Sequence, residues 1–297
     1  MSVEAVLRHF NRAWSQRVGV LDESFLGSGR PIGPSRLLFE VGSASVAVRE
    51  LRDRTGLDSG YVSRLLRRLE REGLVRTEVD PGDARRRLVS LTAEGRLARQ
   101  DLDDRSERLA RDLVAPLSDG QRARLSEALD SADRLLRAAT TVIAPDDPES
   151  APAQLALASY FDELARRFDD GFDPGEESFD AFRPPDGAML LAMSDGEPVA
   201  CGGLQRLDDQ TAEIKRMWVH PDWRGAGLGG RMLRALEQAA VDHGRALVRL
   251  DTNVVLTDAV SMYRRAGYTE IARYNDNPDA HHWFEKSIAH APTSDPG

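Results

Sequence analysis

The chain has 297 residues, of which 41% are hydrophobic, and its formal net charge is −9. This length is typical of two globular domains that each bury a core. No apolar run approaches the roughly 20 residues that a membrane-spanning helix needs, and the charged N-terminus lacks the apolar core of a signal peptide. We therefore expect a cytoplasmic protein without a membrane partner.

Charge is distributed unevenly along the chain. Residues 1–141 hold 25 Arg and 22 Asp or Glu, whereas residues 142–297 hold 15 Lys or Arg and 27 Asp or Glu. The first part is therefore mildly basic and the second part strongly acidic. Eight of the arginines lie between Arg64 and Arg87, and such a cluster indicates contacts with nucleic-acid phosphates.

The single cysteine excludes two structural devices. Cys201 has no partner for an internal disulfide, and no Cys/His spacing in the chain resembles a set of zinc ligands. We interpret Cys201 as a small buried residue in preference to a reactive thiol, and we expect no metal site.

The first informative segment runs from residue 46 to residue 92. Residues 46–55 are predicted to form a short helix, a turn follows at Gly56, and residues 58–73 form a second helix that Asp58 caps. Its apolar residues recur at helical spacing and predict one buried face: Val62, Leu65, Leu66 and Leu69. The opposite face carries Gly60, Ser63, Arg64, Arg67 and Arg71, which suits insertion into a major groove.

Two predicted strands, residues 74–79 and 87–92, follow the second helix. They are joined by DPGDARRR, a polar turn with three consecutive arginines that can place cations in a minor groove. These charges could also do no more than solvate a helix and a hairpin. The uninterrupted order of helix, turn, helix and arginine-rich hairpin favours DNA binding.

Residues 1–141 resemble the MarR family of winged-helix transcription regulators. The resemblance is carried by LDSGYVSRLLRRLEREGLV and by the hairpin residues from Asp80 to Thr92. It implies a homodimer held by the first and last helices of this part, on a near-palindromic site in double-stranded DNA. It also implies a small-molecule effector as a candidate partner, because some members bind small aromatic acids near the dimer interface. The predicted DNA-binding residues are Ser59, Ser63, Arg64 and Arg67 in the major groove, and Arg85, Arg86 and Arg87 in the minor groove.

Helical periodicity continues beyond this hairpin. Leucines recur on one stripe at residues 102, 109 and 113, and on another at residues 125, 129 and 136. Ser118 and Gln121 have the spacing of a capping box at the start of the last helix. The run IAPDDPESAPAQ then holds three prolines, which interrupt helices and central strands. We expect a linker at residues 142–158 and a disordered tail at residues 291–297.

Residues 159–290 alternate strand-like and helical runs. The fold class predicted for the whole chain is thus α+β, with a mainly α winged helix-turn-helix domain at residues 1–141 and a mixed α/β domain at residues 159–290. The strongest signal is the strand AEIKRMWV, followed by HPDW, by RGAGLG from Arg224 to Gly229, and by a helix. Glycines let the backbone approach an anion, and the amides of the helix N-terminus point at it, so this segment predicts a pyrophosphate site.

RGAGLG fits the Arg/Gln-x-x-Gly-x-Gly/Ala pattern of the GNAT acyltransferases. A second match, AVSMYRRAGYTEIARY, is similar to the helix of that family that ends in a tyrosine before a Gly-Tyr turn and a strand. The resemblance covers residues 160–288 and implies a mixed α/β GNAT acetyltransferase domain that uses acetyl-CoA. It implies that backbone amides near Trp218 and Val219 pair with the pantetheine arm. It further implies that the pyrophosphate is held by Arg224, Gly225, Gly227 and Gly229.

Tyr263 is the implied general acid that protonates the departing thiolate. It could also be only a half-buried aromatic residue. The chain departs from the common family pattern seven residues earlier, where Leu256 stands in place of a frequent Asn. Either a side-chain contact to the cofactor is missing, or Asn253 supplies it from one turn earlier.

The acceptor amine must lose a proton before it attacks a thioester. Glu213, on the strand before the glycine loop, is the first candidate base, and His281 and His282 are weaker ones. Alternation along this strand would place Glu213, Lys215 and Met217 on one face, where Glu213 could equally be a solvated or ion-paired residue. The acid-rich segment at residues 161–180 would attract a cationic amine, or it could simply be a solvated face.

Two functions follow from these patterns. The first is a transcription regulator that also acetylates a small amine. The second is a regulator whose GNAT-like half only senses acetyl-CoA or another small ligand. The intact tyrosine and glycine loop favour the first, whereas Leu256 and the undecided base keep the second open.

Overall fold

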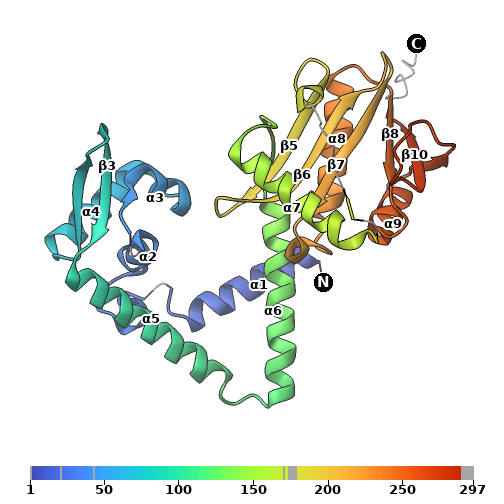
Figure 1. Cartoon of the computed structure of the whole chain (residues 1–297). Coiled ribbons are helices and arrows are strands. Elements are labelled where there is room, and N and C mark those ends of the chain that lie inside the picture. Colours follow the sequence, from blue (N-terminus) through green and yellow to red (C-terminus); the bar gives the residue numbers. More distant parts are fainter. Residues whose placement is uncertain (1, 21, 43, 170, 173–178, 289–297) are drawn as a thin grey trace, which may run out of the picture. The chain divides into compact units, whose positions relative to one another are not determined.

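The computed structural model describes residues 2–20, 22–42, 44–169, 171–172 and 179–288. The chain forms two compact units, Met1–Ala123 and Arg124–Gly297, each with its own core (Figure 1). The predicted tail at residues 291–297 lies outside the described residues. Within the described part, no helix combines the length and apolarity needed to cross a membrane.

The first unit is mainly helical, with a small antiparallel sheet in the order β1-β3-β2. Its elements are α1 (Val3–Arg17), η1 (Phe25–Gly27), α2 (Ile32–Val41), β1 (Val46–Ala47), α3 (Val48–Thr55), α4 (Ser59–Arg71), β2 (Val75–Asp80), β3 (Asp83–Leu91) and α5 (Ala93–Val114). The core gathers apolar residues of α2 to α5, β2 and β3, and it includes Leu38, Leu51, Leu69, Val89 and Leu102. The predicted helix-turn-helix and hairpin are therefore present.

Local capping signals fix where two of the helices begin. Asp58 accepts a hydrogen bond from the Tyr61 amide at 3.0 Å and so starts α4. The predicted capping box is confirmed at the start of α6 (Asp119–Thr140), where the Ser118 amide donates to Oε1 of Gln121 at 2.9 Å and the Gln121 amide donates to Oγ of Ser118 at 3.4 Å. Most of α6 is exposed in the single chain, and Ala138 is its one buried residue.

The second unit contains the rest of α6 and a seven-stranded sheet in the order β4-β5-β6-β7-β8-β10-β9. Strands β7 and β8 are parallel, and the other neighbours are antiparallel. The strands are β4 (Ile143–Asp146), β5 (Gly187–Ser194), β6 (Glu197–Arg206), β7 (Thr211–Val219), β8 (Leu247–Thr252), β9 (Thr269–Ile271) and β10 (His282–Ser287). The helical elements are α7 (Ala151–Arg167), η2 (Phe179–Phe182), η3 (Pro221–Trp223), α8 (Leu228–Asp242) and α9 (Thr257–Arg265).

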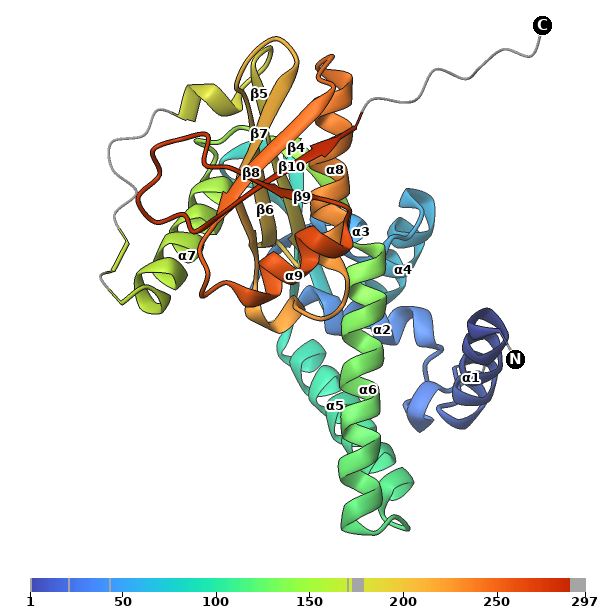
Figure 2. The same cartoon turned by 90° about the vertical axis from the view of Figure 1, so that its right-hand side faces the viewer.

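Helices α7 and α8 cover opposite faces of this sheet (Figure 2). On one face, Ala153, Ala156 and Leu157 of α7 pack with Cys201 and Trp218. On the other face, apolar residues of α8 pack against the alternate residues of β7 and β8: Leu228, Met232, Leu233, Leu236, Ala212, Ile214, Val248 and Leu250. Cys201 is fully buried, as expected, and burial raises the pKa of its thiol to about 12.

The prediction of a linker at residues 142–158 was wrong. Residues 143–146 form β4, which pairs with β5 along the edge of the sheet, and α7 begins at Ala151. Proline is tolerated here because an edge strand needs no donor on its outer side, and because Pro152 occupies the first turn of α7, where the amide would have no helical partner. Two residues, Thr141 and Val142, therefore separate α6 from the sheet.

Strand β7 contains a bulge that sequence alternation did not predict. Two β7 residues, Arg216 and Met217, lie opposite the single residue Gly202 of β6, and Arg216 has a positive φ of 58°. The bulge turns Met217 toward the α8 side, away from the face that Glu213 and Lys215 share, so the expected grouping of these three was wrong. Pairing of β7 with β8 runs only from Thr211 to Glu213, and the two strands separate beyond it.

Candidate functional site

A cavity of about 720 Å³ lies in the second unit, and residues 217–219 at the end of β7 line one side of it. The other walls come from α7, the glycine loop, the first two turns of α8, and α9. Seven of the predicted site residues line this one cavity: Trp218, Val219, Arg224, Gly225, Gly227, Gly229 and Tyr263. Trp218 and Tyr263, which are 45 residues apart in sequence, therefore line the same cavity.

The glycine loop leaves room for a ligand beside its backbone. Gly225 and Gly227 have positive φ angles of 76° and 84°, which L-residues with side chains rarely adopt. A Cβ atom built on either glycine would meet no other atom within 4 Å. Gly227 is also the N-cap of α8 and provides no capping side chain, so the first amides of the helix are available to an anion.

Arg224 is held by an acidic partner that the sequence did not reveal. Its Nη2 donates to Oε2 of Glu163 on α7, and its Nε donates to the Val219 carbonyl oxygen at 3.0 Å. Glu163 also accepts hydrogen bonds from Trp218 Nε1 at 3.1 Å and from Arg167 at 3.0 Å. Burial alone would raise the pKa of the Glu163 carboxyl, but the bonds from Arg224 and Arg167 outweigh burial and hold this pKa below its usual range.

Tyr263 is 6% exposed, and its hydroxyl has no hydrogen-bond partner among the described residues. Its ring packs against Tyr268 and Phe284, with centroids 5.9 Å away in each case. Burial raises the pKa of the hydroxyl well above its ordinary value, and the charge of Asp251 raises it further. The hydroxyl therefore stays protonated at neutral pH, and Tyr263 lines the cavity.

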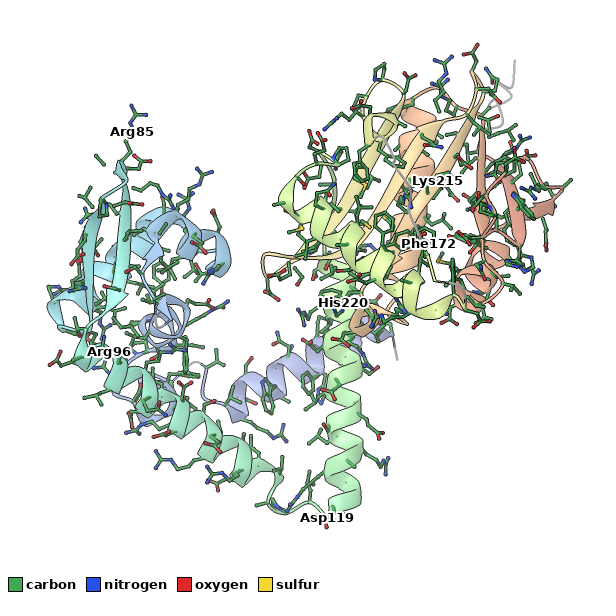
Figure 3. All side chains as sticks on the ribbon, viewed as in Figure 1. Arg85, Arg96, Asp119, Phe172, Lys215 and His220 are labelled. Atoms are coloured by element: carbon green, nitrogen blue, oxygen red, sulfur yellow. The ribbon has the colours of Figure 1, made fainter. Side chains whose placement is uncertain are left out.

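The first unit exposes basic side chains on α4 and on the β2–β3 hairpin. Arg64 and Arg67 of α4 are exposed, and the hydroxyl of Ser63 donates to the Ser59 carbonyl oxygen at 2.8 Å. The three hairpin arginines lie within β3 and not in the turn, because β3 starts at Asp83. Arg85 points outward near the tip of the hairpin (Figure 3).

Comparison with known proteins identifies both parts of the chain. Residues 154–268 match the model of the Acetyltransferase (GNAT) family. An IAA acetyltransferase from Azospirillum brasilense is 30% identical over 125 residues, which cover 40% of this chain and 80% of that protein. The chain belongs to the GNAT acetyltransferase family. A GNAT acetyltransferase from Elizabethkingia anophelis, solved with acetyl-CoA bound, is 18% identical, with a TM-score of 0.37 over 50% of this chain and 97% of that one.

The region upstream of the GNAT domain has its own match. Residues 29–86 match the MarR family model. A MarR-family regulator from Rhodococcus sp. RHA1 is 21% identical, with a TM-score of 0.37 over 44% of this chain and 95% of that one. The chain therefore joins a MarR-family winged-helix domain to a GNAT acetyltransferase domain.

Acetyl-CoA is the cofactor of the GNAT family, and the residues that line the cavity fit it. The open glycine loop and the α8 N-terminus provide for the pyrophosphate. Three further arginines, which the sequence did not single out, also line the cavity and supply positive charge: Arg167, Arg234 and Arg265.

The structure does not support Asn253 as a cofactor contact. The amide of its side chain donates to the Asp279 carbonyl oxygen at 2.7 Å, and its Oδ1 accepts from the Val255 amide at 3.0 Å. Asn253 is buried and does not line the cavity, whereas Leu256 does. The side chain of Asn253 thus shapes the turn after β8, and an apolar group lies at the position where the family often has an amide.

The structure also argues against Glu213 as a base. Glu213 is 2% exposed and does not line the cavity. Its carboxylate accepts hydrogen bonds from Gln205 at 2.7 Å, from the Tyr274 hydroxyl at 2.8 Å and from Asn275 at 3.1 Å. The bonds from Tyr274 and Asn275 hold the segment between β9 and β10 against the sheet, so Glu213 serves as a structural anchor.

The two candidate histidines lie away from the cavity. Nδ1 of His282 is 2.6 Å from a carboxylate oxygen of Glu270, and His281 is exposed. Neither residue lines the cavity. The acid-rich segment at residues 161–180 falls partly outside the described residues, at 170 and 173–178, so its predicted role in attracting an amine remains a prediction.

Proposed function

We propose that this chain is a DNA-binding transcription regulator that also transfers an acetyl group from acetyl-CoA to a small amine. The observation that carries the enzymatic part is the meeting of the glycine loop and the protonated Tyr263 in one cavity. The exposed arginines of α4 and the hairpin support the regulatory part. Regulators of the MarR family bind DNA and typically dimerise, which supports a homodimer on a near-palindromic duplex site.

Each group in the cavity has a distinct task in this proposal. The amides of Gly227 and Gly229, with Arg224, would hold the pyrophosphate, and those of Trp218 and Val219 would pair with the pantetheine arm. When bound, acetyl-CoA supplies an acetyl group activated as a thioester. Tyr263 would donate a proton to the leaving thiolate, and the proton that the attacking amine releases, directly or through water, would restore the hydroxyl.

The test is release of CoA over a panel of primary amines, with the Tyr263→Phe variant beside the wild type. We expect wild-type turnover with at least one amine and a decrease in kcat of about 100-fold in Tyr263→Phe, since acid–base groups typically contribute 10²- to 10⁴-fold. Tyr268→Phe is the matched control, because Tyr268 is a buried neighbour of Tyr263 that does not line the cavity.

The alternative is a domain that senses acetyl-CoA without catalysis. Leu256 in the cavity wall is the observation that favours it, because an apolar side chain replaces a polar cofactor contact. Saturable binding of acetyl-CoA without CoA release from any amine would support this alternative and would contradict the enzymatic proposal.

A further inference from the structure

An acidic side chain lies in the wall of a cavity whose other features suit an anion. Glu163 of α7 is buried, and it lines the cavity together with Arg224 and the glycine loop. A carboxylate without a compensating cation at this place would repel the pyrophosphate of the cofactor. The hydrogen bonds of Glu163 explain why the site contains it.

Two arginines compensate the charge of Glu163. Nη1 of Arg167, one helical turn farther along α7, donates to Oε1 of Glu163 at 3.0 Å, and Nη2 of Arg224 donates to Oε2. Trp218 Nε1 donates to the same Oε2 at 3.1 Å. One carboxylate and two guanidinium groups leave a net positive charge, so the cluster as a whole still attracts an anion.

The carboxylate of Glu163 is itself held from the turn that follows β8. Nη2 of Arg167 donates to the Val255 carbonyl oxygen in this turn at 2.9 Å. On the other side of Glu163, Nε of Arg224 donates to the Val219 carbonyl oxygen at the end of β7. A continuous series of bonds therefore links β7 and β8 beyond the point where their pairing ends, and Glu163 lies in the middle of this series.

These bonds fix the guanidinium group of Arg224. Its side chain is partly exposed, and a free arginine side chain loses rotamer freedom when it binds a ligand. The bonds to Glu163 and Val219 use two of the five N–H donors of the planar group, which leaves three donors for phosphate oxygens. Because the side chain is ordered before the ligand arrives, binding costs less conformational entropy.

We propose that Glu163 is a positioning residue for the cofactor, which acts by holding Arg224 in place for the pyrophosphate of acetyl-CoA. This inference rests on the proposed function, in which the pyrophosphate lies at the glycine loop. Glu163 itself makes no bond to the cofactor, so its whole effect on affinity passes through Arg224. The Arg/Gln-x-x-Gly-x-Gly/Ala pattern does not include Glu163, which belongs to a different helix 61 residues upstream of Arg224.

The experiment is a double-mutant cycle on the full-length protein, in which calorimetry measures the dissociation constant of acetyl-CoA. Its variants are Glu163→Gln, Arg224→Gln and the two changes together. Arg224→Gln keeps the family pattern, which allows Arg or Gln at this position, so we expect measurable binding in this background. Glu163→Gln should weaken acetyl-CoA binding about 10-fold when Arg224 is present and less than about 2-fold in the Arg224→Gln background.

Turnover provides a second measurement. In assays of CoA release, Glu163→Gln should raise the KM for acetyl-CoA by about the same factor as the dissociation constant. The value of kcat should change little, because the change removes binding of the cofactor and leaves Tyr263 as it is.

Two further variants separate positioning from folding. Glu237 of α8 has a side chain 13% exposed, against 11% for Glu163, and pairs with Lys286 at 2.9 Å, but it does not line the cavity. Glu237→Gln should therefore leave the affinity for acetyl-CoA unchanged. Glu163→Asp keeps the negative charge between the two arginines and protects the fold, but its shorter side chain should also lose affinity only when Arg224 is present.

The outcomes distinguish this inference from the function on which it rests. Equal losses of affinity in both backgrounds, or the same loss in Glu237→Gln, would mean that Glu163 only supports the domain, and would overturn the proposal. Unchanged or tighter binding in Glu163→Gln would also overturn it. The expected cycle without CoA release from any amine would support the role of Glu163 and would contradict the proposed catalysis.

Discussion

At the scale of single residues, Gly227 sets the backbone shape of the anion loop. Its φ of 84° and the empty space beside it mean that a side chain would both strain the loop and fill the phosphate position. We expect Gly227→Val to abolish the increase in melting temperature that acetyl-CoA gives the wild type. Differential scanning fluorimetry across a range of acetyl-CoA concentrations measures this increase.

A matched variant separates strain from ligand exclusion. Gly244 has a φ of 76° and equally open surroundings, but it does not line the cavity. Gly244→Val should carry a similar cost of about 1–2 kcal/mol in the free energy of unfolding and yet keep the full acetyl-CoA shift. A normal shift in Gly227→Val would place the cofactor elsewhere.

Glu163 links the cofactor loop to acid stability. The folded-state pKa of its carboxyl lies below the ordinary value of 4.5, so the ion pair stabilises the fold above that pH and is lost as pH falls through the folded pKa. We expect the wild type to exceed Glu163→Gln in free energy of unfolding by about 1–3 kcal/mol at neutral pH. Urea titrations at decreasing pH should show this difference shrinking below about pH 4.5.

The control for this effect is Asp162→Asn, at an exposed position on the same helix. The free energy of unfolding of Asp162→Asn should differ little from that of the wild type at every pH. A gap between wild type and Glu163→Gln that stays constant into acid would mean that packing, and not the carboxylate charge, accounts for the effect of Glu163.

At the scale of elements, the β2–β3 hairpin is predicted to supply phosphate contacts independent of base sequence. Arg85 and Arg86 are exposed, and β-strand alternation directs them to opposite sides of the hairpin. We expect the double change of both residues to Ala to weaken binding to all duplexes and to reduce the slope of log affinity against log salt by about 0.9 for each lost contact. Fluorescence anisotropy at several salt concentrations measures both quantities.

The matched control for the hairpin is Arg108→Ala with Arg111→Ala, which removes two exposed arginines of α5. This variant should retain the wild-type slope. Selection from random duplexes should also enrich a near-palindromic site, and failure to enrich any site would remove the main support for the regulatory proposal.

Elements that depend on neighbouring residues were predictable from sequence, and those that depend on distant ones were not. Helical spacing placed Leu65 and Leu69 on the buried face of α4, and a four-residue pattern located the start of α6. Strand β4 was missed because its pairing with β5 outweighs the local effect of proline. The partners Glu163 and Arg224 are 61 residues apart, so no local pattern could connect them.

The bulge at Arg216 shows the same limit within one strand. Alternation correctly placed Glu213 and Lys215 on one face of β7. The extra residue of the bulge moves Met217 to the opposite face. The motif RGAGLG was informative because its glycines act through their own backbone angles, which the sequence determines directly.

At the scale of the whole molecule, the end of α6 is fixed to the elements that form the cofactor loop. Arg231, in the first turn of α8, donates to the carbonyl oxygens of Ala138 and Thr141, the latter at 2.7 Å. Arg137 of α6 lies over the Trp223 ring at 4.6 Å, and Trp223 immediately precedes Arg224. Within the second unit, the end of α6 is therefore packed against η3 and α8.

These contacts at the end of α6 predict that the binding of acetyl-CoA and the binding of DNA are coupled. If the cofactor shifts α8 and η3, the end of α6 must respond, because Arg231 and Arg137 bond it to both elements. By linkage, acetyl-CoA and DNA must then change each other's affinity by the same factor, about 5- to 150-fold for a coupling of 1–3 kcal/mol. Operator titrations with and without saturating acetyl-CoA measure this factor.

The role of the Arg231 contacts is tested by Arg231→Gln. This variant should reduce the coupling factor toward one, while DNA and acetyl-CoA each still bind alone. Arg245→Gln is the control, since Arg245 donates a comparable bond to the Asp209 carbonyl oxygen at 2.8 Å but contacts no part of α6. It should leave the factor unchanged. Identical operator affinities with and without acetyl-CoA in the wild type would contradict the coupling. The two domains would then bind their ligands independently.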